Sequence, residues 1–378
     1  MIYVLSFSTL SALLFAVDSR PSRDIIKRFV ISLAVLVPCC VAGFRALNIG
    51  TDTSVYAYPM YKCAIASDSF FSYYESVFMS GWHQRPISSI EVGFSLLVFV
   101  VAKCARSFQV LLFLVQFLTI APIFSALYSM RQKYPLWIGA AVYYFLFFGS
   151  SLNIMRQWVA IAFMLLAMVF FFSNKKSLSV IALIAGISFH YSLVLISICL
   201  LSVWYLLRGA RTSRQSEKRL VLIAVLGILI ISNLNSLSGV LSRLGFGSYS
   251  SGYLNGSLGL SVNQIVLRLP ALCVYLYCFH KTRKEEWNTL EGFFLAMFIL
   301  DLFASQMGTV SGQSLRISFY FGSFQILGLP YFIYNEKKKR TILTALLIGY
   351  LCIYWYVYYV IYGYSSIYPY EVVRSEEH

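Results

Sequence analysis

Long apolar runs separated by short polar turns make up most of the chain. Thirteen apolar segments can be marked, and several are shorter than the roughly 20 residues that a membrane-spanning helix needs. They are residues 1–17, 29–47, 88–102, 107–129, 136–149, 157–173, 177–189, 191–207, 219–235, 263–279, 287–305, 316–334 and 341–362. The pattern predicts an all-α, polytopic integral membrane protein. Because no linker or soluble-type repeat interrupts it, we expect a single domain, residues 1–378.

One stretch, from Phe147 to Phe172, places a polar group where two of these runs meet. Asn153, Arg156 and Gln157 stand within five residues of one another. An arginine costs roughly 2.5 to 3.5 kcal/mol at a bilayer centre and much less at the interface. Arg156 is therefore either a snorkelling anchor or part of a functional site.

Composition supports the membrane assignment. The mean hydropathy is +0.73, and 12% of the residues are charged, against about 25% in soluble domains. No cleavable signal pattern opens the chain, so residues 1–17 are expected to remain as the first span. The net charge of +15 comes from short basic clusters without an aromatic-basic RNA motif, so no nucleic-acid partner is expected. Neither the eight cysteines nor the four histidines have disulfide or metal-site spacing.

The basic clusters predict the topology. Six of them hold 20 of the 30 basic residues, at 18–28, 131–133, 174–176, 208–219, 280–284 and 337–340. By the positive-inside rule these turns are cytoplasmic, which places both termini, residues 48–87 and the loop 236–262 outside. Two outer termini require an even number of spans. We therefore expect about 12 spans, with 88–102 re-entrant or interfacial; an ordinary thirteenth span is the alternative.

The basic residues outside these clusters are mostly arginines. Four of them, Arg45, Arg156, Arg268 and Arg316, lie within or at the outer edge of apolar segments. A guanidinium keeps its charge when partly desolvated and binds phosphate through two parallel hydrogen bonds, which lysine cannot reproduce. Together these arginines predict an anion site on the outer side.

Other polar residues near the outer ends of the segments could carry chemistry. Asp52 and Tyr56 follow Gly50 in a short polar turn, where Asp52 either caps the loop or takes part in the chemistry. Glu91 opens an apolar segment, either as a helix N-terminal carboxylate or as a catalytic base. His190 ends another segment, either as a structural residue or as a group that exchanges a proton near neutral pH.

Four further parts of the chain carry expectations of their own. Residues 64–87 are rich in aromatic residues, which predicts one or two amphipathic interfacial helices. The glycine-rich loop within 236–262 is a lid or a plain connector. Asp301 is expected to pair with an arginine across the bundle. Arg316 and Tyr320 are four residues apart and share one helix face.

The chain resembles the EpsG family of bacterial exopolysaccharide proteins and, more broadly, Wzy-type O-antigen polymerases. The residues that carry the resemblance are Arg45, Gly50, Thr51, Asp52, Thr53, Tyr56, Glu91, Gly93, Asn153, Arg156, Gln157, Phe189, His190, Arg316 and Tyr320. It implies a GT-C-like glycosyltransferase of exopolysaccharide or lipopolysaccharide biosynthesis in the bacterial inner membrane, with its active site facing the periplasm. The enzyme would move a growing glycan from undecaprenyl diphosphate to the non-reducing end of the next lipid-linked repeat unit. Besides that substrate and membrane lipids, a chain-length regulator protein is a partner compatible with this role.

The reaction assigns roles to these residues. Lipid diphosphate gains negative charge as it leaves, and positioned cations stabilise that charge. We expect Arg45, Arg156, Arg268 and Arg316 to bind the diphosphate, without a metal or cofactor. Asn153, Gln157, Tyr56 and Tyr320 would contact substrate. The acceptor hydroxyl must lose a proton, for which His190, Glu91 and Asp52 are the candidate bases.

Three other activities fit parts of the pattern. A flippase for lipid-linked oligosaccharide would also use buried arginines, but its chain should show two related halves, which this sequence lacks. A membrane acyltransferase would place its polar residues on the cytoplasmic side. An O-antigen ligase differs from a polymerase only in its acceptor, and the sequence alone does not separate the two.

Overall fold

The computed structural model describes residues 2–19, 23–210, 213–233, 243, 258–282 and 288–373. These residues form two compact units, which are described separately. Unit 1 comprises Met1–Val194 and Leu351–His378, and unit 2 comprises Leu195–Tyr350. Most of the predicted outer loop 236–262 lies outside the described residues.

Unit 1 is built from helices, with one small two-stranded sheet. Its elements are α1 (Ile2–Ser19), α2 (Asp24–Gly43), the π-helix η1 (Thr53–Ala57), α3 (Tyr58–Ala66), α4 (Phe70–Glu75), β1 (Val77–Ser80), β2 (His83–Pro86), η2 (Ile87–Ser89), α5 (Val92–Cys104), α6 (Phe108–Ser129), α7 (Leu136–Val142), η3 (Tyr143–Phe147), α8 (Phe148–Asn153), α9 (Met155–Phe172), α10 (Lys176–Phe189), η7 (Tyr356–Ile361) and η8 (Tyr364–Ser366).

Helix α9 forms the centre of unit 1. It packs against α6 and α10, and Trp158, Ile161 and Leu165 are fully buried. Gly186 of α10 allows close helix packing, since a Cβ there would lie 3.2 Å from the Ala160 carbonyl oxygen. Small residues permit this kind of approach between membrane helices. The stretch from Phe147 to Phe172 therefore lies in the core of the unit.

The two ends of unit 1 differ in chemistry. At one end, the first turns of α6 and α9 share an apolar cluster with Phe189, the last residue of α10. At the other end, Asp18 Oδ2 accepts a hydrogen bond from the Trp137 backbone N–H (3.1 Å), which joins the α1–α2 and α6–α7 turns. The described residues of the basic turns 18–28, 131–133 and 174–176 thus lie at this second end, as the positive-inside rule requires of one membrane face.

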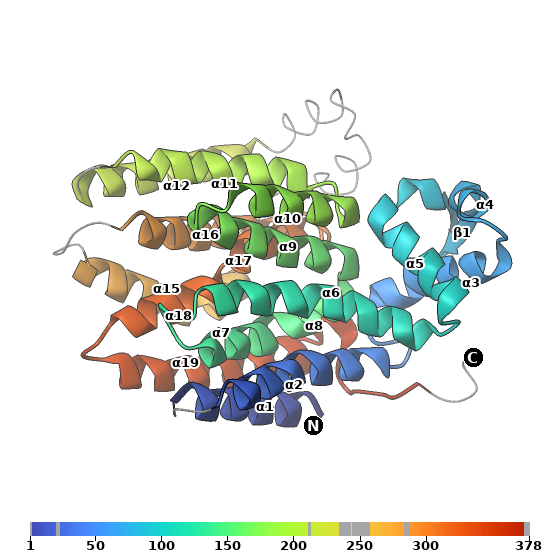
Figure 1. Ribbon diagram of the computed structural model, residues 1–378. Coiled ribbons are helices and arrows are strands. Elements are labelled where there is room, and N and C mark those ends of the chain that lie inside the picture. The colour runs from blue at the N-terminus through green and yellow to red at the C-terminus, as the bar shows by residue number, and fades with distance from the viewer. Residues whose placement is uncertain are drawn as a thin grey trace. The chain divides into compact units, whose positions relative to one another are not determined.

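The segment between α2 and α6 lies at the first end. Figure 1 shows α3, α4, β1 and α5 gathered beyond the end of α9 and beside the start of α6. Helix α5 starts where Glu91 meets His190, and three residues separate its end from the start of α6. Both ends of α5 therefore lie at the same end of the unit. The 13 residues of α5 span about 20 Å, short of the roughly 30 Å hydrocarbon core.

One or two interfacial helices are predicted for residues 64–87, and the structure has the short helix α4 there, but the second half of the segment is not helical. Helix α4 is followed by an antiparallel hairpin in which Val77 pairs with Pro86 and Ser80 with His83. Gly81 turns the chain with a φ of +62°, a conformation that glycine adopts without steric cost. Alternating exposure along β1 allows Phe78 to be buried while its neighbours face outward.

Unit 2 is also helical. Its elements are α12 (Ser213–Ser232), α15 (Val262–Thr282), α16 (Thr289–Gln306), η5 (Met307–Thr309), η6 (Ser314–Ile317), α17 (Ser318–Gly322) and α18 (Gln325–Asn335); α11 (Leu193–Arg208) begins in unit 1 and α19 (Arg340–Trp355) ends there. Helix α16 packs against α12, α15 and α18, and Phe293 and Phe294 of α16 are fully buried.

The chain is a multi-pass membrane protein. Among the described residues, eight helical segments are long and apolar enough to cross a membrane: Ile2–Ser19, Asp24–Gly43, Phe108–Ser129, Leu136–Asn153, Met155–Phe172, Val262–Phe279, Thr289–Thr309 and Arg340–Ile361. The other four predicted spans coincide with the shorter α10 and α11, with α12, and with η6, α17 and α18 together. The total of 12 stays a prediction, as does the GT-C-like fold.

Candidate functional site

A break between helices α8 and α9 positions the polar residues in the middle of the chain. Helix α8 ends at Asn153 and α9 begins at Met155, while Ile154 between them is non-helical (φ −98°, ψ 62°). Arg156 therefore lies in the first turn of α9. A cation there opposes the positive end of the helix dipole, so it requires an anionic partner nearby.

Glu91 is that partner. Its Oε2 accepts a hydrogen bond from Arg156 Nη1, and its Oε1 lies 2.7 Å from His190 Nδ1. The same Oε1 lies 3.4 Å from the backbone N–H of Tyr191. Glu91 occupies the N-cap position of α5, but its side chain makes no capping hydrogen bond. The carboxylate instead joins a cation from the first turn of α9 and an imidazole that directly follows α10.

The carboxylate of Glu91 is buried and ionised. Its side chain is 2% exposed. Burial by itself raises the pKa of Glu91, but the charge of Arg156 and the hydrogen bond from His190 outweigh it and bring the pKa to about 2. Glu91 therefore carries its negative charge throughout the neutral and mildly acidic range.

Close backbone packing brings Glu91 to His190. Gly93 lies against the end of α10, where a Cβ would come within 2.7 Å of the Ser188 carbonyl oxygen. His190 follows α10 in an extended conformation (φ −158°, ψ 110°), which ends the helix at that point. Only a residue without a side chain at position 93 allows this approach. Gly93 belongs to the motif of the resemblance, but no local signal in the sequence pairs it with Ser188.

Tyr56 and Asp52 complete the polar cluster. The Tyr56 hydroxyl donates to Asp52 Oδ2 (2.9 Å), and the guanidinium of Arg156 lies 4.6 Å from the centre of the Tyr56 ring. Burial, followed by the charge of Asp52, raises the pKa of Tyr56 well above its usual range, so the phenol stays a neutral donor. Asn153 accepts a hydrogen bond from Thr51 (2.7 Å). Gln157 is buried in the first turn of α9.

Arg45 lies nearby but is bound to protein groups. Its Nη2 lies 3.1 Å from both Thr53 Oγ1 and the Leu152 carbonyl oxygen, the latter at the end of α8. The residue is 2% exposed, and burial lowers its pKa to about 10, which still leaves it charged near neutral pH. Gly50 (φ +79°) allows the chain to pass Leu152, because a Cβ would lie 2.6 Å from the same carbonyl oxygen. Arg45 thus joins the 44–53 loop to the helix break.

Unit 2 holds the remaining predicted residues. Arg268 Nε and Nη2 bind the two carboxylate oxygens of Asp301 at 2.9 and 3.0 Å, which confirms the prediction that Asp301 pairs with an arginine. Arg268 Nη1 also donates to Gln264 Oε1 (2.6 Å). Arg316 lies in η6 and Tyr320 is buried in α17. That Arg268 and Arg316 converge with Arg156 on one cavity stays a prediction.

A model of the EpsG family matches residues 28–372, which is nearly the whole chain. The match includes the polar cluster around Glu91 in unit 1 and the residues around Arg268 in unit 2. The chain matches no curated protein. It also matches no solved structure.

Proposed function

Because the chain belongs to the EpsG family, which is associated with exopolysaccharide synthesis, we propose that it is a polysaccharide polymerase. It transfers a growing glycan from undecaprenyl diphosphate to the non-reducing end of the next lipid-linked repeat unit. The observation that carries the proposal is the bridging position of Glu91, which holds an imidazole on one oxygen and a guanidinium on the other.

The imidazole is the group suited to accept the proton. In the transfer, an acceptor hydroxyl attacks the anomeric carbon, the bond from that carbon to the diphosphate oxygen breaks, and the hydroxyl proton goes to a base. When His190 donates its Nδ1–H to ionised Glu91, its Nε2 is the basic nitrogen. Glu91 then fixes the tautomer and stabilises the imidazolium that forms, as carboxylates do beside catalytic histidines in other enzymes.

Glu91 itself is poorly suited to be the base. A general base works best when its pKa lies near the operating pH, and the pKa of Glu91 is about 2. Both of its oxygens also have protein partners. Asp52 is the remaining candidate, but it accepts a hydrogen bond from Tyr56. We therefore assign His190 as the base and Glu91 as a positioning residue.

Arg156 is suited to the leaving diphosphate. One of its terminal nitrogens binds Glu91, while the side chain keeps 19% of its surface exposed. A guanidinium has five N–H donors, so donors remain for phosphate oxygens. The N-terminus of the 18-residue α9 favours negative charge at the same place. Arg45 contacts Thr53 and the Leu152 carbonyl oxygen beside the helix break. We therefore give it a structural role and do not include it among the diphosphate ligands.

Reconstitution tests the proposal. Purified protein in vesicles would receive lipid-linked repeat units prepared from a strain that lacks it, and the glycans would be separated on a gel. We expect a ladder that lengthens with time and one undecaprenyl diphosphate released per transfer. Movement of repeat units across the vesicle membrane without lengthening would indicate a flippase. Transfer of finished polymer to another lipid, without lengthening, would indicate a ligase.

A further inference from the structure

A largely apolar cavity with a few polar groups lies at the same end of unit 1. It has a volume of about 260 Å³ and lies between α3, the α5–α6 turn and the end of the described chain at Val373. Its residues include Tyr58, Tyr61, Lys62 and Ile65. The spacing of these four, at i, i+3, i+4 and i+7, places them on one face of α3. Tyr56, two residues earlier, contacts Phe94 and Arg156 instead.

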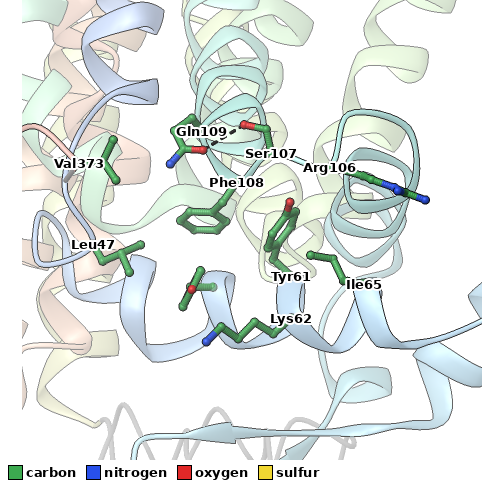
Figure 2. A pocket seen from close by; sticks show the side chains of 10 residues that line it. Leu47, Tyr61, Lys62, Ile65, Arg106, Ser107, Phe108, Gln109 and Val373 are labelled. Carbon is green, nitrogen blue, oxygen red and sulfur yellow. Dashed lines mark hydrogen bonds between the residues drawn. The ribbon is translucent and has the colours of Figure 1, made fainter. Parts of the chain in front are cut away.

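The walls of the cavity combine aromatic faces with a few polar groups. Phe108 lies with its ring centre 5.1 Å from that of Tyr58 and 5.4 Å from that of Tyr61. The Lys62 ammonium lies 4.7 Å from the centre of the Tyr58 ring, which holds the charge beside the aromatic surface. Ser107 donates to Gln109 Oε1 (3.0 Å), which turns the Gln109 amide nitrogen away from Ser107. Figure 2 shows Tyr61, Lys62, Ser107, Phe108 and Gln109 around the cavity.

Among the described residues, the charges that line the cavity have one sign. None of the ten lining residues is acidic. Lys62 is exposed at the cavity. Arg106 is the other basic residue of the lining, but Figure 2 shows its side chain directed away from Tyr61 and Phe108. The cavity therefore offers one ammonium group, an amide donor and flat aromatic surfaces.

We propose that this cavity is a subsite for a single acidic sugar unit of the lipid-linked glycan. The aromatic rings would pack on the C–H face of the sugar, Gln109 would donate to a hydroxyl, and Lys62 would pair with a carboxylate or phosphate substituent. The volume is below the roughly 300 to 1,000 Å³ of sites for drug-sized ligands, which favours one sugar ring over a lipid with its acyl chains. The proposal rests on the proposed function, because it takes the glycan as substrate.

Binding by the purified protein tests this subsite without any transfer reaction. The probes are a disaccharide that contains glucuronic acid and its neutral glucose counterpart, followed by saturation-transfer NMR with the detergent-solubilised protein. We expect the acidic probe to bind more tightly. Lys62→Gln should weaken binding of the acidic probe about three- to fivefold, the range of a partly exposed ion pair. Its affinity for the neutral probe should stay unchanged. Gln109→Ala should weaken both probes.

Two controls separate the subsite from other effects. Arg106→Gln removes a positive charge from the same lining, but the Arg106 side chain is directed away from Tyr61 and Phe108. This variant should therefore bind both probes like the wild type. His190→Ala should abolish transfer while retaining both affinities, which distinguishes failure of the polymerase proposal from failure of this one. Equal affinity for the two probes, equal losses in Lys62→Gln and Arg106→Gln, or Lys62-dependent binding of short-chain phosphatidylglycerol in place of the disaccharides would each overturn the subsite.

Discussion

Glu91 Oε1 lies 2.7 Å from His190 Nδ1, although 99 residues separate the two in the chain. The other carboxylate oxygen of Glu91 binds Arg156. One buried anion therefore positions both a candidate base and a candidate diphosphate ligand. Loss of Glu91 should disturb both at once, whereas loss of either partner should leave the other in place.

The first prediction concerns His190. In His190→Ala, chain extension should fall about a hundred- to ten-thousandfold, the usual contribution of a general base. The measurement is the initial rate of ladder growth with reconstituted protein at matched amounts. The control is His83→Ala, which changes an exposed histidine of β2 and should extend chains at the normal rate. Near-normal extension by His190→Ala would leave Asp52 as the base to test.

The second prediction concerns the charge of Glu91. Glu91→Gln keeps the shape but places an amide N–H₂ opposite either Arg156 or His190, both of which donate to the carboxylate. We expect chain extension to fall by at least about a hundredfold, the scale on which loss of a positioned catalytic interaction acts. Glu75→Gln, at an exposed position at the end of α4, is the matched control. Unchanged rates in Glu91→Gln would show that the bridge has no part in transfer.

The third prediction is a pH dependence of stability. The pKa of Glu91 is lowered from 4.5 to about 2. Because the folded value is below the unfolded one, the stabilisation is complete above about pH 4.5 and is lost as the pH falls through about 2. The difference in unfolding temperature between wild type and Glu91→Gln, measured in detergent, should therefore shrink on acidification. A difference that grows as the pH falls would contradict the assignment.

The fourth prediction separates two arginines. Arg156→Lys should insert and fold normally but lose polymer growth, because an ammonium does not reproduce the two-pronged contact with phosphate. Arg45→Lys should lower folding yield and thermal stability, because a single ammonium cannot reach both Thr53 and Leu152 as the guanidinium does. Yield and unfolding temperature are compared with activity per folded molecule. A stable, inactive Arg45→Lys would return Arg45 to the diphosphate site.

The fifth prediction concerns α5. Since both of its ends lie at the same end of unit 1, single cysteines at positions 89 and 106 should react with an impermeant reagent from the same side of the membrane. A cysteine at position 132 should react only from the opposite side. The eight native cysteines are first replaced. Labelling of positions 89 and 106 from opposite sides would make residues 88–102 a true span.

The sequence by itself determined the class of protein and most of its helical segments. Apolar runs bounded by basic turns can be recognised locally. Each membrane helix makes its backbone hydrogen bonds within itself, and each basic turn favours the cytoplasmic side of the membrane. For the same reason, the conformational break beside Asn153 and Arg156 could be anticipated from a polar group between two apolar runs. Family motifs also marked Glu91, Arg156 and His190 as candidates.

Only the tertiary structure decided which of these candidates meet. The approach of Glu91 to His190 depends on the contact between Gly93 and Ser188, and the burial of Arg45 depends on a carbonyl group freed at Leu152. Neither partner carries a local sign of the pairing, since both contacts join segments about a hundred residues apart. The hairpin at 77–86 is a similar case, because pairing between its strands outweighed the helical pattern of its aromatic residues. The type of a side chain determines the chemistry it can perform, but its role depends on neighbours that folding brings from elsewhere in the chain.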